Sequence, residues 1–153
     1  DTPVFAAFSE DDRTVDSDRT VEVMDRYGAS RKNRRIVYTK TPRPDQAGMH
    51  GVTVYECSSL PAERILDFSH IAVPIPPDDP HYGRNGDYKN CLHYISEPDK
   101  RRRCLSGGET VWEGELTSAN LRAVTLRRLS YNPLFPRLLR QIDLFLRDTE
   151  ARD

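Results

Sequence analysis

The chain has 153 residues, which is about the size of one ordinary domain and long enough to bury a hydrophobic core. Its formal net charge is −1 although 31% of its residues are charged, so no overall field attracts nucleic acid or an anionic membrane. No apolar run reaches the roughly 18 residues that would span a bilayer, and we expect no transmembrane segment.

The first predicted elements are a strand and a helix. Residues 3–8, "PVFAAF", form an apolar run between Pro3 and the acidic "SEDD", typical of a short strand buried on both faces. "DSDRTVEVMDRYG" follows with helix signals: an N-cap and negative first turn among residues 16–18, apolar residues spaced i+3 and i+4, and Gly28 to end the helix.

Two further strands are predicted in the next stretch. "RRIVYTKT" and "GVTVYECS" are rich in β-branched and aromatic residues, and a Pro- and Gly-bearing segment, 42–51, separates them. The sequence leaves open whether both lie in the main sheet. A mostly apolar run, Ile65 to Phe68, then reads as strand-like and leads directly into Ser69 and His70.

The second half divides into an irregular excursion and a helix. From Pro74 to about Gly108 the chain shows no periodicity, which is typical of a functional or covering segment. A helix over 133–147 is predicted by Asn132 as N-cap, Pro133 as first helical residue and one apolar stripe. Strand, helix, strand, loop and helix together predict the α/β class, with a single domain over residues 1–153.

Three cysteines, Cys57, Cys91 and Cys104, are an odd and sparse set. This count argues against a disulfide framework and favours a reducing compartment, so a cytoplasmic location is the expectation.

A candidate site emerges where two of these elements end. A catalytic histidine needs a carboxylate to fix its tautomer, and such a carboxylate is best held on a turn after a sheet strand. "VFAAFSEDDRTVD" supplies such a turn, and His70 is the candidate base.

The segments around Asp12 and His70 resemble those of a known enzyme family. "TPVFAAFSEDDRTVDSDRTVEVM" is similar to the acid-bearing segment of α/β-hydrolases, in particular the monoacylglycerol lipase and lysophospholipase-like branch, and "FSHIAVP" resembles that family's histidine loop. Matched residue by residue, the triad acid falls on Asp12 and the triad histidine on His70, in the family's chain order and 58 positions apart. The resemblance implies a serine hydrolase that acts on a small-molecule carboxylic ester or related acyl group and requires no cofactor.

The chain departs from the family in one large respect. No Gly-x-Ser-x-Gly occurs in the 153 residues, and the family carries its nucleophile and oxyanion-hole loop upstream of the acid strand. The sequence opens on Asp1, close to a predicted core strand. We therefore expect a C-terminal part of such an enzyme, inactive alone, whose partner is the missing N-terminal part of the same fold.

Other interpretations of the site stay open. Asp11 is an alternative acid, both aspartates could serve only as caps, and His70 could lack chemistry. Zinc is disfavoured at Cys91-x-His93 with Cys104 and His81, because the spacing is not that of paired Cys-x-x-Cys knuckles. Calcium is disfavoured at "PDDPHYGRNGDY", which lacks the EF-hand order and has the composition of turns. We thus expect no metal.

The alternative function is a non-enzymatic binding domain. Its contact surface would combine a tyrosine-rich loop, Tyr82, Tyr88 and Tyr94, with two basic clusters, 31–35 and 100–103. Those clusters are expected to be solvated faces rather than phosphate sites, because neither is interleaved with aromatic residues, so no nucleic-acid partner is expected. A Gly-x-Ser-x-Gly upstream would favour the enzyme.

Overall fold

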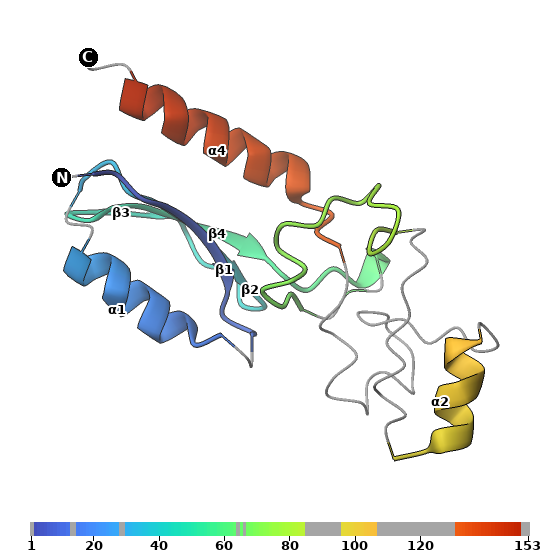
Figure 1. Cartoon of the computed structure of the whole chain (residues 1–153). Coiled ribbons are helices and arrows are strands. Elements are labelled where there is room, and N and C mark those ends of the chain that lie inside the picture. The colour runs from blue at the N-terminus through green and yellow to red at the C-terminus, as the bar shows by residue number, and fades with distance from the viewer. Residues whose placement is uncertain are drawn as a thin grey trace.

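The computed structural model of the protein describes residues 2–12, 15–27, 30–63, 65, 67–84, 96–106 and 131–150. Its centre is a sheet of four strands: β1 (Phe5–Ser9), β2 (Arg34–Thr39), β3 (Gln46–Gly48) and β4 (Gly51–Cys57). The spatial order is β1-β2-β4-β3, with β1, β2 and β4 parallel and β3 antiparallel to β4 (Figure 1).

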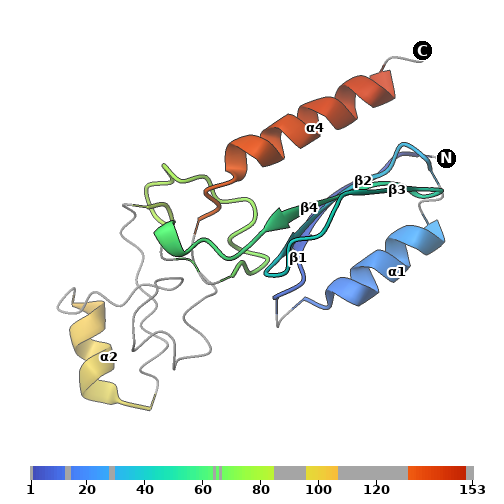
Figure 2. The same cartoon turned by 180° about the vertical axis from the view of Figure 1, so that it is seen from behind.

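Helices cover both faces of this sheet. α1 (Ser17–Tyr27) lies on one face and α4 (Phe135–Glu150) on the other, as both views show (Figures 1 and 2). A third helix, α2 (Pro98–Leu105), lies apart from the sheet, and a short 3₁₀ turn, Pro61–Glu63, follows β4. This layered arrangement confirms the predicted α/β class.

The N-cap predicted for the first helix is confirmed: Asp16 Oδ1 accepts a hydrogen bond from the Arg19 amide at 3.1 Å, so Asp16 is the N-cap of α1. The N-cap predicted for α4 is wrong. Asn132 Oδ1 accepts the Leu134 amide at 2.8 Å, but the helix begins only at Phe135, so Asn132 and Pro133 belong to the turn that leads into it. Both predicted helices are present, although α4 begins two residues later and ends three residues later than expected.

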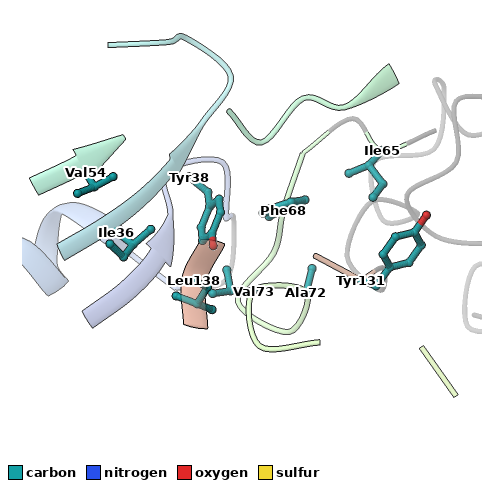
Figure 3. Close-up of a cluster of buried hydrophobic side chains, with 9 residues drawn as sticks. All are labelled: Ile36, Tyr38, Val54, Ile65, Phe68, Ala72, Val73, Tyr131 and Leu138. Atoms are coloured by element: carbon teal, nitrogen blue, oxygen red, sulfur yellow. The ribbon is translucent and has the colours of Figure 1, made fainter. Parts of the chain in front are cut away.

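The core lies between the sheet and α4. It comprises nine buried residues: Ile36, Tyr38, Val54, Ile65, Phe68, Ala72, Val73, Tyr131 and Leu138 (Figure 3). At its centre the rings of Tyr38 and Phe68 meet at 4.9 Å between centroids. Burial raises the pKa of Tyr38 from its ordinary value of 10.0 to about 12.

The amino ends of the strands are joined through Asn33, which is 2% exposed. Its Oδ1 accepts the Val4 amide at 2.9 Å, and its backbone carbonyl accepts the Val52 amide at 2.9 Å. Gly51 approaches closely here with φ of 102°, and a Cβ at this position would lie 2.0 Å from the Asn33 oxygen. Only glycine fits this conformation and this contact.

Three sequence predictions need correction. The described residues of the run from Ile65 to Phe68 form no strand: Ile65 forms one isolated bridge with Leu60 across the 3₁₀ turn, and Ile65 and Phe68 are buried in the core. The excursion from Pro74 to Gly108 is not wholly irregular, because it contains α2, a helix without an apolar stripe. The short strand β3 within 42–51 was not predicted either.

The basic cluster 31–35 is also not simply a solvated face. Arg34 reaches α4, donating to Gln141 at 2.6 Å and Asp148 at 3.1 Å, and its side chain is 15% exposed. Arg35 pairs with Asp25 of α1 and is 12% exposed. Because β2 lies between two helices, its arginines are used to dock them.

Candidate functional site

The acid-bearing turn follows β1 at the carboxyl edge of the sheet. Ser9, the last residue of β1, is 1% exposed. Its hydroxyl accepts the Asp11 amide at 3.2 Å and its carbonyl accepts the Asp12 amide at 3.3 Å. The Glu10 amide also bonds the Tyr38 carbonyl at 2.9 Å, so pairing with β2 continues past the end of the strand. The turn is thus held both by the end of β1 and by β2.

The histidine-bearing loop is anchored to the same region through the core. Phe68 is fully buried against Tyr38, and the Ser69 carbonyl accepts the amides of Ala72 and Val73 at 3.1 and 3.3 Å. These bonds turn the chain immediately after Ser69. His70 therefore projects from a tight turn rather than from the end of a strand, and its rigidity comes from core packing.

The structure brings the two predicted site residues together. Asp12 Oδ2 lies 2.6 Å from His70 Nδ1, and the same oxygen accepts the backbone amide of His70. The other oxygen, Oδ1, accepts the Val15 amide at 3.0 Å. The Asp12 side chain is 3% exposed, whereas that of His70 is 41% exposed. A buried, fully hydrogen-bonded carboxylate thus holds a partly exposed imidazole by Nδ1.

The alternative acid, Asp11, points elsewhere. Its Oδ2 accepts the Ser58 hydroxyl at 2.6 Å, and Lys40 Nζ lies 3.6 Å from its Oδ1. Geometry therefore favours Asp12 over Asp11 as the partner of His70. Asp12 also caps its own turn through the Val15 amide, so capping and contact with His70 coexist. The catalytic roles of Asp12 and His70 stay predictions.

Three residues next to this pair were not singled out from the sequence. Lys40 follows β2, Ser58 follows β4, and Asp67 precedes His70 in its loop. Lys40 Nζ lies 2.6 Å from Asp67 Oδ2. Lys40 and Ser58 could have been found from the predicted topology. In parallel strands, the residues just after the carboxyl ends lie at the same edge of the sheet, where ligands and catalytic groups gather.

The structure describes only some of the residues considered as metal ligands. Within the described part of the chain, no group of three or more metal-binding side chains comes together. Cys91 and His93 lie outside the described residues. In the calcium-like segment, Asp79 Oδ1 accepts the Tyr82 and His81 amides at 2.7 and 2.9 Å, and these bonds lower the pKa of the Asp79 carboxyl. Asp79 thus serves as a turn residue.

The loop beyond His70 is tied down by a second polar group. Arg84 donates twice to Glu63, at 3.1 and 2.9 Å, and Tyr131 donates to Glu63 Oε2 at 2.8 Å. The Tyr131 hydrogen bond is the main cause that lowers the pKa of the Glu63 carboxyl. This group joins the 3₁₀ turn to Arg84 and to Tyr131, which precedes α4.

The surface of the alternative binding function is only partly described. The basic cluster 100–103 lies on α2, where Lys100, Arg101, Arg102 and Arg103 are exposed as predicted. Tyr82 packs against the His81 ring at 4.6 Å between centroids, whereas Tyr88 and Tyr94 lie outside the described residues. Among the helices the structure describes, none is long and apolar enough to cross a membrane.

A separate pocket of about 190 Å³ lies between α1 and the sheet. Its lining combines Glu10, Asp18 and Arg35 with apolar residues of α1 and β2. Neither Asp12 nor His70 lines this pocket, so it is distinct from the pair.

Comparisons of the chain with protein-family models, with curated proteins and with solved structures find no match. The interpretation of the site therefore rests on the chemistry and geometry of the chain's own residues.

Proposed function

We propose that Asp12 and His70 are the acid and the base of a serine hydrolase that acts on carboxylic esters or related acyl groups. The observation that carries the proposal is the 2.6 Å contact between a 3% exposed carboxylate and Nδ1 of a 41% exposed imidazole. In the Ser-His-Asp arrangement the acid contacts one ring nitrogen and leaves the other to exchange protons with the nucleophile.

The chemistry follows from this orientation. A carboxylate at Nδ1 stabilises the tautomer with a proton on Nδ1, which leaves Nε2 as a base. In this mechanism Nε2 removes the proton of a serine as it attacks the acyl carbon, then donates the proton to the departing alcohol. Asp12 stabilises the imidazolium that forms between these steps, and its bonds to the Val15 and His70 amides keep it in place.

The position of the pair in the fold also supports the proposal. Both residues lie at the carboxyl edge of a parallel sheet, where α/β enzymes place their active sites. The acid follows a strand and the histidine follows later in a loop, as in the α/β-hydrolases that these segments resemble. The proposal assigns the nucleophile and the oxyanion-hole donors to residues outside this sequence, since the 153 residues hold no Gly-x-Ser-x-Gly.

The test is kinetic and uses the complete gene product with a short-chain p-nitrophenyl ester. His70→Ala should remove most of kcat, and Asp12→Asn should reduce it on the order of 10⁴-fold, as the corresponding change does in serine proteases. The matched control is His50→Ala, which removes an exposed histidine from the turn between β3 and β4. If His70→Ala is as active as His50→Ala, His70 is not the base and the proposal fails.

A further inference from the structure

A lysine at the carboxyl edge contacts both segments that carry the Asp12–His70 pair. Lys40 Nζ lies 2.6 Å from Asp67 Oδ2 and 3.6 Å from Asp11 Oδ1. Asp67 is three residues before His70, and Asp11 is adjacent to Asp12. One ammonium group from the end of β2 thus connects the acid turn with the histidine loop.

Charge explains why a cation is needed at this position. The side chains of Asp11, Asp12 and Asp67 are only 17%, 3% and 7% exposed. Carboxylates withdrawn from water and gathered at one edge repel one another, and burying a charge is costly unless it is paired. Lys40 pairs with two of them at once, so removing it would weaken the compensation of negative charge between the two segments.

A hydroxyl completes the connection to the sheet. Ser58, the first residue after β4, donates to Asp11 Oδ2 at 2.6 Å. The Ser58 amide in turn bonds the Thr39 carbonyl at 3.0 Å, next to Lys40. Asp11 is therefore held to β4 on one side and to Lys40 on the other, which gives the lysine a fixed point from which to hold Asp67.

We propose that Lys40 is a positioning residue that sets the distance between Asp12 and His70, an inference that rests on the proposed function of that pair. Lys40 acts through Asp11 and Asp67 and contacts no reacting atom. Its salt bridges keep the histidine loop against the acid turn, so that Nδ1 meets Oδ2 at 2.6 Å and the ring stays in the productive tautomer.

The test measures the tautomer of His70 in the 153-residue chain from the ring nitrogen chemical shifts, at a pH where the imidazole is neutral. Free histidine prefers the proton on Nε2, whereas an acceptor at Nδ1 favours the Nδ1–H form. The wild-type chain should show the Nδ1–H form. In Lys40→Met the ratio of Nδ1–H to Nε2–H should fall about fivefold or more, as expected for a coupling lost between contacting groups.

Two variants separate positioning from loss of charge. Lys40→Arg keeps a cation that can bridge Asp11 and Asp67, and it should retain the wild-type ratio. Arg43→Met removes a cation of matched exposure, 40% against 42% for Lys40, that pairs with Glu10 in the same turn. This control should also retain the wild-type ratio. An equal fall in Arg43→Met would show a general charge effect and overturn the role of Lys40.

A third variant guards against failure to fold. Lys40→Met removes the cation that pairs with both Asp11 and Asp67, so Lys40→Met/Asp67→Asn removes one of those two negative charges as well. This double variant lacks the bridge and should show the same fall in the ratio. A wild-type ratio in either variant overturns the proposal for Lys40 alone. A wild-type chain with the proton mainly on Nε2 would instead overturn the Asp12–His70 function, and the role of Lys40 with it.

Discussion

Replacing Asn132 with alanine should be among the most destabilising single changes outside the candidate site. Asn132 is fully buried where the chain enters α4. Its Nδ2 donates to the Tyr38 hydroxyl at 2.9 Å and to the Val73 carbonyl at 3.0 Å, and its Oδ1 accepts the Leu134 amide at 2.8 Å. One side chain thus joins β2, the turn after His70 and the start of α4.

The cost of Asn132→Ala follows from these partners. Losing the acceptor of the Leu134 amide in the turn before α4 costs about 1 kcal/mol. The Tyr38 hydroxyl and the Val73 carbonyl each lose a buried donor, at about 1–2 kcal/mol each. The total is about 3–5 kcal/mol, against a stability of roughly 5–15 kcal/mol for an ordinary domain. Urea denaturation followed by far-ultraviolet circular dichroism measures this loss as a lower midpoint at an unchanged slope.

Two variants apportion the loss. Asn132→Ser keeps an oxygen that can accept the Leu134 amide, so it should recover about 1 kcal/mol relative to alanine. Tyr38→Phe removes one acceptor of Nδ2, and a double-mutant cycle with Asn132→Ala should give a coupling of about 1 kcal/mol. A loss below about 1 kcal/mol for Asn132→Ala would refute the reasoning, because buried partners left unpaired cannot be that inexpensive.

Four further outcomes are expected. In the complete gene product, the kcat/KM of the Asp12→Asn/His70→Ala double variant for an ester should be close to that of His70→Ala alone, because Asp12 and His70 act as one unit. Additive losses of kcat/KM would contradict this. The 153-residue chain alone should hydrolyse p-nitrophenyl acetate no faster than its own His70→Ala variant, since it lacks the oxyanion donors and nucleophile of the proposed enzyme. Gly51→Ala should lower the melting temperature sharply, because a Cβ would lie 2.0 Å from the Asn33 oxygen, whereas Gly48→Ala, with nothing within 4 Å, should change it little. The pKa of the Glu63 carboxyl is lowered in the folded protein, so Glu63 stabilises the fold above its ordinary pKa of 4.5, and this contribution is lost as the pH falls through the lower folded value. The urea midpoints of the wild type and of Glu63→Gln should therefore differ at neutral pH and become equal in acid.

The strands and helices that could be predicted are those whose signal is local. β1, β2 and β4 are apolar or β-branched runs bounded by turn residues. Both α1 and α4 carry an amphipathic stripe, and an N-cap precedes α1. β3 has no such signal: its residues are all exposed, and it forms only because Gln46 pairs with Thr53 of β4. α2 also lacks a local signal. Five of its eight residues, "PDKRRRCL", are charged, so it has no apolar stripe from which a helix could be predicted.

The error at residues 65–68 has a different origin. Ile65 and Phe68 are buried at 1% and 0% exposure, as a strand would require, but they enter the core from a loop. Phe68 packs on the Tyr38 ring, and Ile65 forms an isolated bridge with Leu60. A short apolar run indicates that its residues are buried, but it does not indicate which backbone hydrogen-bond partners they have.

The same distinction separates what could be foreseen at the candidate site from what could not. The contact of Asp12 with His70 was predictable because the two segments resemble the acid-bearing and histidine-bearing segments of α/β-hydrolases, whereas the strand and turn alone offered both Asp11 and Asp12. Lys40 carries no such pattern: its place beside Asp11 and Asp67 depends on β2 lying next to β1 and on where a non-strand loop crosses the sheet edge. A residue that follows a predicted parallel strand can be placed at this edge of the sheet from the sequence, but its pairing with particular carboxylates depends on strand order and on the path of a loop. The pairs of Lys40 with Asp11 and Asp67 therefore emerge only after the fold is assembled, by following the charge that each buried carboxylate needs.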